Sequence, residues 1–86
     1  MKIKDGYLLK KVAGDFVIVP IKKGAFTSVM TLNETGAFLF EKISEGADET
    51  GAVKALLEEY NTNEQTALRD VRNFIAALSR AGVLEE

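Results

Sequence analysis

The chain has 86 residues, of which 47% are hydrophobic and 28% are charged, and its formal net charge is −2. These proportions are ordinary for a globular domain, and a single Pro with seven Gly argues against a disordered or low-complexity segment. The sequence has no His and no Cys, which excludes the Ser-His-Asp triad, the Cys-His pair and the usual zinc sites within this chain. We therefore expect one small, complete domain over residues 1–86 that is not an enzyme and holds no metal or other cofactor.

No apolar run approaches the roughly 20 residues that a membrane-spanning helix needs. The N-terminal residues Met1-Lys-Ile-Lys-Asp5 also lack the apolar stretch of a signal peptide. The absence of Cys fits a reducing compartment. These features predict a cytoplasmic protein without a membrane partner.

Charge is divided unevenly along the chain. The first 24 residues hold six lysines against two aspartates, whereas the remainder holds five basic and eleven acidic residues. Lysines on hairpins commonly protect sheet edges and solvate the surface, so this asymmetry does not by itself predict a binding patch.

Three β-rich runs with short connections open the chain. The runs Tyr7–Val12 and Phe16–Ile21 are separated by Ala13-Gly14-Asp15, which suits a hairpin. From Ala25 to Leu32 the apolar residues alternate with period two, which predicts a third strand. Consecutive strands with short joins form an antiparallel meander, so the second run is predicted at the centre, and the third has one edge without a neighbour in sequence.

The central strand is apolar on both faces. Alternation places Phe16, Ile18 and Pro20 on one face and Val17, Val19 and Ile21 on the other. Helices can cover only one face of so small a sheet, so we expect the other to be shielded by the N-terminal segment, a partner enzyme, or a second copy in a homodimer. Because Pro20 cannot donate a hydrogen bond, full pairing is predicted to stop near Val19 or to bulge there.

The first of three predicted helices follows the third strand directly. Asn33 is a good N-cap residue, Glu34 places a negative charge in the first turn, and Gly46 marks the end. The apolar face between them consists of Phe38, Leu39, Phe40 and Ile43.

Two more helices complete the chain. Asp48 caps the second, and the third begins at either Thr62 or Asn63 and stops at Gly82. The buried stripe of the second is Val53, Leu56, Leu57 and Tyr60, and that of the third is Leu68, Val71, Phe74, Ile75 and Leu78. The fold class is therefore α+β: a winged helix-turn-helix-like chain with a three-stranded antiparallel meander followed by three helices. An unrelated α+β domain is the alternative.

This architecture makes a winged-helix DNA-binding regulator one functional hypothesis. A DNA-reading third helix normally presents several basic side chains to phosphates and bases. Residues 63–80 carry three arginines against two acidic residues, and the chain has a pI near 5.2. Weak phosphate neutralisation leaves little affinity at cellular salt, so DNA binding is the alternative function and nucleic acid is not the expected partner.

Three stretches stand out by their order and spacing: the hairpin Tyr7–Pro20, the run Leu32-Asn33-Glu34-Thr35-Gly36-Ala37 with its aromatic-rich helix, and Ala67–Phe74 leading to Leu78–Leu84. Together they resemble the PqqD family of small proteins in pyrroloquinoline quinone biosynthesis. The resemblance extends to the wider class of peptide-recognition domains in pathways that make ribosomally synthesised, post-translationally modified peptides. It implies a non-catalytic module that captures the leader segment of a precursor peptide. The module presents that leader to a modifying enzyme, commonly a radical S-adenosylmethionine enzyme.

The resemblance also implies where the leader binds, namely as a strand beside the third strand and in a groove against the third helix. The residues expected to bind the peptide are Ala25, Phe26, Thr27, Ser28, Val29, Met30 and Thr31 of the strand, and Arg69, Arg72, Asn73 and Ala76 of the helix. For the four helix positions, a solvent-exposed helix face is the alternative interpretation. The sequence leaves open the identity of the precursor peptide and whether the pathway makes pyrroloquinoline quinone.

Overall fold

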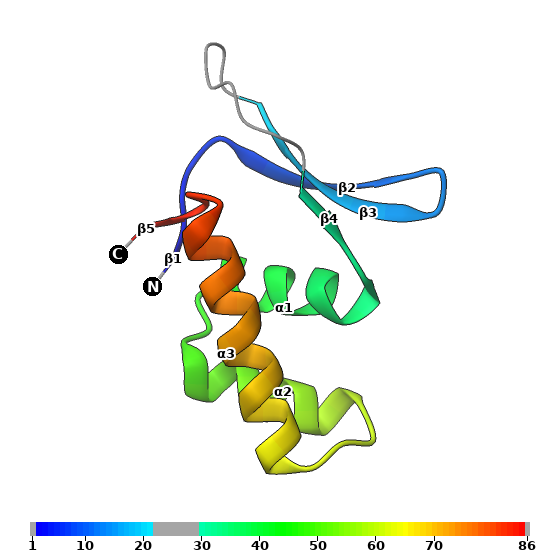
Figure 1. The fold of residues 1–86 in the computed structure, drawn as a ribbon, viewed down its shortest axis with the longest axis vertical. Coiled ribbons are helices and arrows are strands. Elements are labelled where there is room, and N and C mark those ends of the chain that lie inside the picture. The colour runs from blue at the N-terminus through cyan, green and yellow to red at the C-terminus, as the bar shows by residue number, and fades with distance from the viewer. Residues whose placement is uncertain (1, 22–29, 86) are drawn as a thin grey trace.

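The computed structural model describes residues 2–21 and 30–85 of the chain. The elements follow in the order β1 (Lys2–Ile3), β2 (Tyr7–Val12), β3 (Asp15–Pro20), β4 (Met30–Leu32), α1 (Glu34–Ser44), α2 (Glu49–Glu59), α3 (Glu64–Arg80) and β5 (Leu84–Glu85). Strands β2, β3 and β4 form an antiparallel sheet in that order, and three helices follow it (Figure 1). The predicted α+β class, with its meander and its three helices, is confirmed.

A tight turn joins β2 to β3. Ala13 and Gly14 both have positive φ, 53° and 87°, as a two-residue type I′ hairpin requires. The register pairs Val12 with Asp15 next to the turn and Tyr7 with Pro20 at the far end. The hairpin predicted from the sequence is therefore present, with its loop one residue shorter than expected.

The prediction that pairing would fail near Val19 is wrong. Strand β3 continues to Pro20, and beyond it the Ile21 N–H donates to the carbonyl oxygen of Gly6 at 2.7 Å. Hydrogen-bonded and non-hydrogen-bonded pairs alternate along an antiparallel ladder. Because Gly6 and Ile21 form a hydrogen-bonded pair, the neighbouring Tyr7–Pro20 pair is non-hydrogen-bonded. The missing N–H of Pro20 therefore removes no hydrogen bond to β2.

The three helices begin at side-chain caps. The Oδ1 atoms of Asn33, Asp48 and Asn63 accept hydrogen bonds from backbone N–H groups at 2.7 Å, 2.8 Å and 2.8 Å, respectively. Asn63, rather than Thr62, is thus the N-cap of α3. Helix α1 ends before Gly46 and α3 before Gly82, and both glycines have positive φ.

A second, two-stranded sheet was not predicted from the sequence. Strand β1 pairs antiparallel with β5, so that Ile3 lies opposite Leu84, and the Lys4 N–H donates to the carbonyl oxygen of Val83 at 2.8 Å. Two-residue strands are too short to show a period. This pairing holds the two ends of the described chain side by side (Figure 1).

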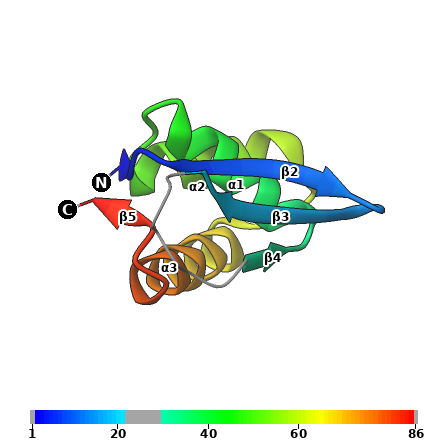
Figure 2. The same cartoon turned by 90° about the horizontal axis from the view of Figure 1, so that it is seen from above.

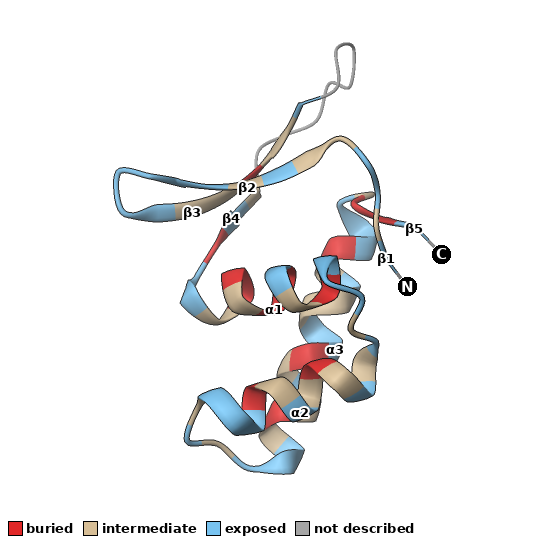
Figure 3. Ribbon diagram, turned by 180° about the vertical axis from the view of Figure 1, so that it is seen from behind, coloured by how far each residue is buried: buried red, intermediate tan, exposed pale blue. Residues whose placement is uncertain are grey.

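The hydrophobic core has two parts that meet at Phe74 and Ile75 of α3. One part packs α1, the C-terminal half of α3 and β5 against the sheet, through Ile18, Leu32, Phe40, Ile43, Leu78, Val83 and Leu84. The other joins the three helices through Leu39, Ala52, Leu56, Ala67 and Val71. Buried residues accordingly concentrate in the helices and in the parts of the sheet next to them (Figure 3). Within the described chain no helix is long and apolar enough to cross a membrane.

The sheet has a covered face and an open face. The covered face carries Ile18, which is 2% exposed, with its cross-strand partners Leu9 and Met30. The open face is defined here by Leu8, Lys10, Val12, Asp15, Val17, Val19 and Thr31, which share the other side by register, and Ile21 continues it. The sequence left undecided which face of the central strand the helices take, and the structure assigns them the face of Phe16, Ile18 and Pro20.

Candidate functional site

The free edge of β4 presents the backbone of one residue, Thr31. Phe16 forms a non-hydrogen-bonded pair with Lys11 of β2, so the N–H and C=O groups of Phe16 point toward β4 and pair with Leu32. Ile18 pairs with Met30 in the same way. Thr31, between these two pairs, therefore directs its N–H and C=O away from β3. No strand pairs with this side of β4 among residues 2–21 and 30–85. Figure 2 shows β4 as the outer strand on the side of the sheet where α3 lies.

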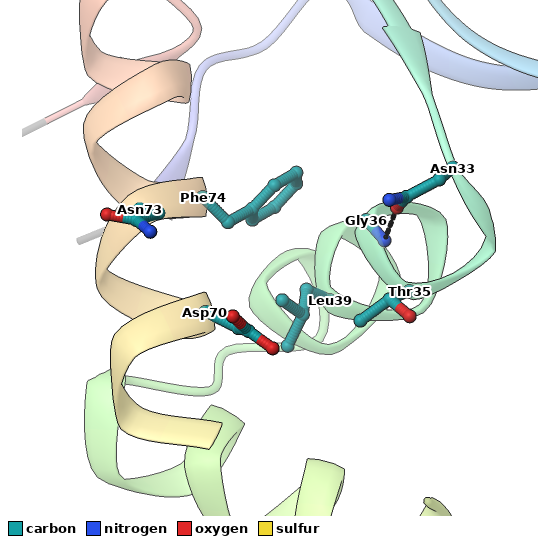
Figure 4. A pocket seen from close by; sticks show the side chains of 7 residues that line it. All are labelled: Asn33, Thr35, Gly36, Leu39, Asp70, Asn73 and Phe74. Atoms are coloured by element: carbon teal, nitrogen blue, oxygen red, sulfur yellow. Dashed lines mark hydrogen bonds between the residues drawn. The ribbon is translucent and has the colours of Figure 1, made fainter. Parts of the chain in front are cut away.

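A pocket of about 370 Å³ lies directly beyond the end of β4, between the start of α1 and the middle of α3 (Figure 4). It is lined by Asn33, Thr35, Gly36 and Leu39 from one side and by Asp70, Asn73 and Phe74 from the other. The aromatic ring of Phe74 and the aliphatic Leu39 give it an apolar floor, whereas amide, hydroxyl and carboxylate groups stand at its rim. A pocket of this composition suits one anchoring side chain of a ligand.

Gly36 allows the two walls of this pocket to approach one another. A Cβ atom at this position would lie 3.4 Å from Cε1 of Phe74, 3.4 Å from Cβ of Leu32 and 3.2 Å from Oδ1 of Asn33. Its N–H donates to Asn33, so the residue that caps α1 also shapes the pocket. The helix start and the pocket are thus built from the same few residues.

Charges at the rim come from α3. The Asp70 carboxylate lines the pocket and accepts from Arg69 at 3.3 Å, with both side chains largely exposed. Behind α1, burial and then the carboxylates of Glu34 and Glu59 raise the pKa of Tyr60, whose ring meets Phe38 edge-on at 5.4 Å. The phenol is therefore neutral at physiological pH and adds no charge near the pocket.

The residues predicted to bind peptide occupy different environments. Ala25, Phe26, Thr27, Ser28 and Val29 lie outside the described residues. Met30 packs its side chain into the core under the sheet, whereas Thr31 is exposed. Of the helix positions, Asn73 lines the pocket, Arg69 contacts the pocket residue Asp70, Arg72 bonds Glu49 of α2 at 2.8 Å, and Ala76 is exposed.

Sequence reasoning missed most of the pocket. Phe74 was assigned to the core stripe alone, and Asn33, Thr35, Gly36, Leu39 and Asp70 were not proposed as site residues. One signal was present, because Asn33, Thr35 and Gly36 lie within the stretch that carries the family resemblance. What the sequence could not show was that this stretch faces Phe74, since the contact depends on tertiary packing.

A known protein family matches most of this chain. The family model described as coenzyme PQQ synthesis protein D (PqqD) matches residues 15–84. The chain belongs to the PqqD family. No curated protein matches the chain. The match includes β3, β4, all three helices and every residue that lines the pocket.

Two solved structures share the fold of this PqqD family member. One is described as TbiB1 in complex with the TbiA(beta) leader peptide, is 27% identical, and aligns over 99% of this chain and 95% of its own with a TM-score of 0.81. The other is a lasso peptide synthetase B1 complexed with the leader peptide, with 18% identity, coverage of 99% and 96%, and a TM-score of 0.79. Neither the family match nor these structures support the DNA-binding alternative.

Proposed function

We propose that this chain binds the leader segment of a precursor peptide as a strand added to the free edge of β4. The observation that carries the proposal is the outward-facing backbone of Thr31 with a pocket at the end of the same strand. Strand addition is a recurring mode of peptide recognition, in which main-chain hydrogen bonds give affinity and pockets for alternate side chains give specificity. The leader-peptide complexes of TbiB1 and of the lasso peptide synthetase B1 support this assignment.

Backbone pairing alone does not account for binding. Each added hydrogen bond contributes about 1 kcal/mol, while ordering each residue of the leader costs about 1 to 2 kcal/mol. The missing free energy must come from side chains. We assign that role to the pocket between α1 and α3, where an apolar leader side chain would contact Phe74 and Leu39 and meet polar groups of Asp70 and Asn73 at the rim.

The family match supports a proposal for the biological setting. We propose that the whole chain, residues 1–86, acts as one non-catalytic domain in the cytoplasm and passes the leader to a modifying enzyme, of the radical S-adenosylmethionine class. The peptide-binding residues named from the sequence, Ala25 to Thr31 with Arg69, Arg72, Asn73 and Ala76, stay part of this proposal. A homodimer is one of the three covers expected from the sequence for the sheet face that the helices leave open, and sedimentation tests it.

A pair of proline variants at the two edges of the sheet tests the proposal. Thr31→Pro removes the outward N–H of β4 without removing a bond to β3, and Pro is tolerated at such edge positions. Lys11→Pro is the matched control, because Lys11 also belongs to a non-hydrogen-bonded pair with β3 and directs its N–H to the opposite edge, that of β2. Loss of one hydrogen bond with local distortion predicts about tenfold weaker leader binding by Thr31→Pro and unchanged binding by Lys11→Pro.

Fluorescence anisotropy with a labelled synthetic peptide that covers the leader of the precursor measures both affinities. Circular dichroism confirms that each variant is folded. Equal leader affinity in folded Thr31→Pro and wild-type proteins would exclude addition at β4. Loss of affinity in Lys11→Pro alone would move the leader to β2.

A further inference from the structure

Three of the four exposed large hydrophobic residues in the described part of the chain lie on the open face of the sheet. Leu8 is 43% exposed, Val12 is 53% exposed and Ile21 is 63% exposed, while Val17 and Val19 between them are half-buried. Register places Leu8 opposite Val19, so the apolar side chains adjoin one another across β2 and β3, with Lys10 opposite Val17 among them. A contiguous apolar patch of this kind usually marks an interaction site.

The structure excludes one of the three candidates expected to cover the open face, the N-terminal segment. The N-terminal segment does not lie over the open face, because β1 pairs with β5 and Ile3 packs against the core under the sheet. The figures agree, since β1 lies beside β5 at the end of the molecule away from the β2–β3 turn (Figures 1 and 2).

The charges on the open face distinguish the two remaining candidates for covering it, a second copy of the chain and a partner enzyme. Lys10 lies in the middle of the patch, between Leu8 and Val12 along β2, and Asp15, the carboxylate on this face, lies at the turn. A two-fold axis at Lys10, in the middle of the patch, would bring the Lys10 ammonium groups of two copies together, which opposes a symmetric dimer centred there. A different protein can place a carboxylate opposite Lys10. On this face Lys10 lies at the centre and Asp15 at the edge, so the centre of the patch favours an acidic group on the partner.

We propose that the open face docks the modifying enzyme through an apolar surface that carries a carboxylate opposite Lys10. The proposal rests on the proposed function in one respect: a leader strand beside β4 extends the same sheet, so its alternate side chains continue the open face next to Thr31. An enzyme seated on the open face would then contact the outer side of the bound leader. This arrangement places the captured peptide at the boundary between the two proteins.

Two substitutions on the open face test this docking. At these exposed positions, Leu8→Glu places a negative charge on an apolar part of the patch and Lys10→Glu inverts the charge at its centre. Lys10→Arg keeps the positive charge. Leu57→Glu is the matched control. Leu57 was predicted in the buried stripe of α2, but it is 37% exposed and lies in a separate hollow between α2 and α3. The probe is the purified modifying enzyme of the same pathway, immobilised for surface plasmon resonance. Leader affinity is measured separately for each variant.

The proposal predicts that Leu8→Glu and Lys10→Glu bind the enzyme at least about tenfold more weakly, as expected for central interface residues, and keep their leader affinity. Lys10→Arg and Leu57→Glu should bind as the wild type does. Wild-type binding by Leu8→Glu and Lys10→Glu, or no binding by the wild-type chain, would overturn the docking proposal. So would a wild-type dimer in sedimentation that Leu8→Glu dissociates. Failure of the wild type to bind leader while these enzyme results hold would instead contradict the proposed function alone.

Discussion

The two faces of the β2-β3-β4 sheet have similar sequences and different environments. Ile18 and Val19 are neighbours on the same strand and are both β-branched, yet Ile18 is 2% exposed under the helices and Val19 lies on the open face. Alternation shows that both faces are apolar, but only the packing of α1 and α3 decides which becomes core. The apolar face that remains open is then available for recognition rather than stability.

The largest effect expected from this comparison concerns folding. Ile18→Lys places a charge in the core cluster and should destabilise the domain by about 4 kcal/mol or more, which is enough to unfold many small domains. Val19→Lys can extend its ammonium group into water and should cost about 1 kcal/mol or less. Urea unfolding followed by circular dichroism compares them. Equal destabilisation by the two variants would show that the open face is core in solution.

A smaller effect separates two helix starts that share the residues Glu-Thr-Gly-Ala. Gly36 and Gly51 each donate to the cap residue three positions earlier, but Gly36 also faces Phe74. Ala is a better helix former than Gly by about 1 kcal/mol. A Cβ atom at either position would lie close to its cap oxygen, 3.2 Å from Asn33 Oδ1 or 3.3 Å from Asp48 Oδ1, so the two sites differ in the 3.4 Å contacts of Gly36 with Phe74 and Leu32. Gly51→Ala should therefore be the more stable variant, because those contacts offset the gain in Gly36→Ala.

The Gly36→Ala and Gly51→Ala variants also test the role of the pocket between α1 and α3. Because the added methyl group at position 36 narrows the space between α1 and α3, Gly36→Ala should weaken leader binding by about threefold to tenfold, and Gly51→Ala should not change it. Thermal unfolding and leader titration of both variants provide the two readouts. Unchanged leader affinity in a folded Gly36→Ala protein would place the anchor side chain of the leader elsewhere.

The smallest effect involves two arginines on α3. Arg72 is bonded to Glu49 at 2.8 Å, whereas Arg69 contacts the carboxylate at the pocket rim, and both pairs are exposed. Exposed ion pairs contribute about 0.5 kcal/mol. If the leader is acidic, Arg69→Ala should weaken its binding about twofold and Arg72→Ala should weaken it less. Titrations at low and high salt measure the difference, and an equal or larger loss in Arg72→Ala would contradict this order.

Much of the fold was predictable from local residue patterns. The caps at Asn33 and Asp48, the Gly14 hairpin and the alternation of β2 and β3 each depend on neighbours in sequence, and each is found in the structure. The β1–β5 pair was missed because Ile3 and Leu84 meet only after the chain has folded. The effect of Pro20 was misjudged because it depends on the register of β3 against β2, which a single strand does not reveal.

The site was less predictable for the same reason. Periodicity identified Phe74 as apolar, but its ring contributes both to the core and to the pocket, and only the position of Gly36 across from it creates the space. Arg72 was expected beside the leader because of its place on α3. Its bond to Glu49 depends on how α2 packs against that helix.

Amide hydrogen exchange at the two sheet edges tests the central claim most directly. In the leader-saturated protein, the Thr31 amide should exchange more slowly than in the free protein, since it gains a hydrogen bond at the edge of β4. The Lys11 amide, at the edge of β2, should exchange at the same rate in both states. Exchange that is unchanged at Thr31, or slowed at Lys11 instead, would contradict the account.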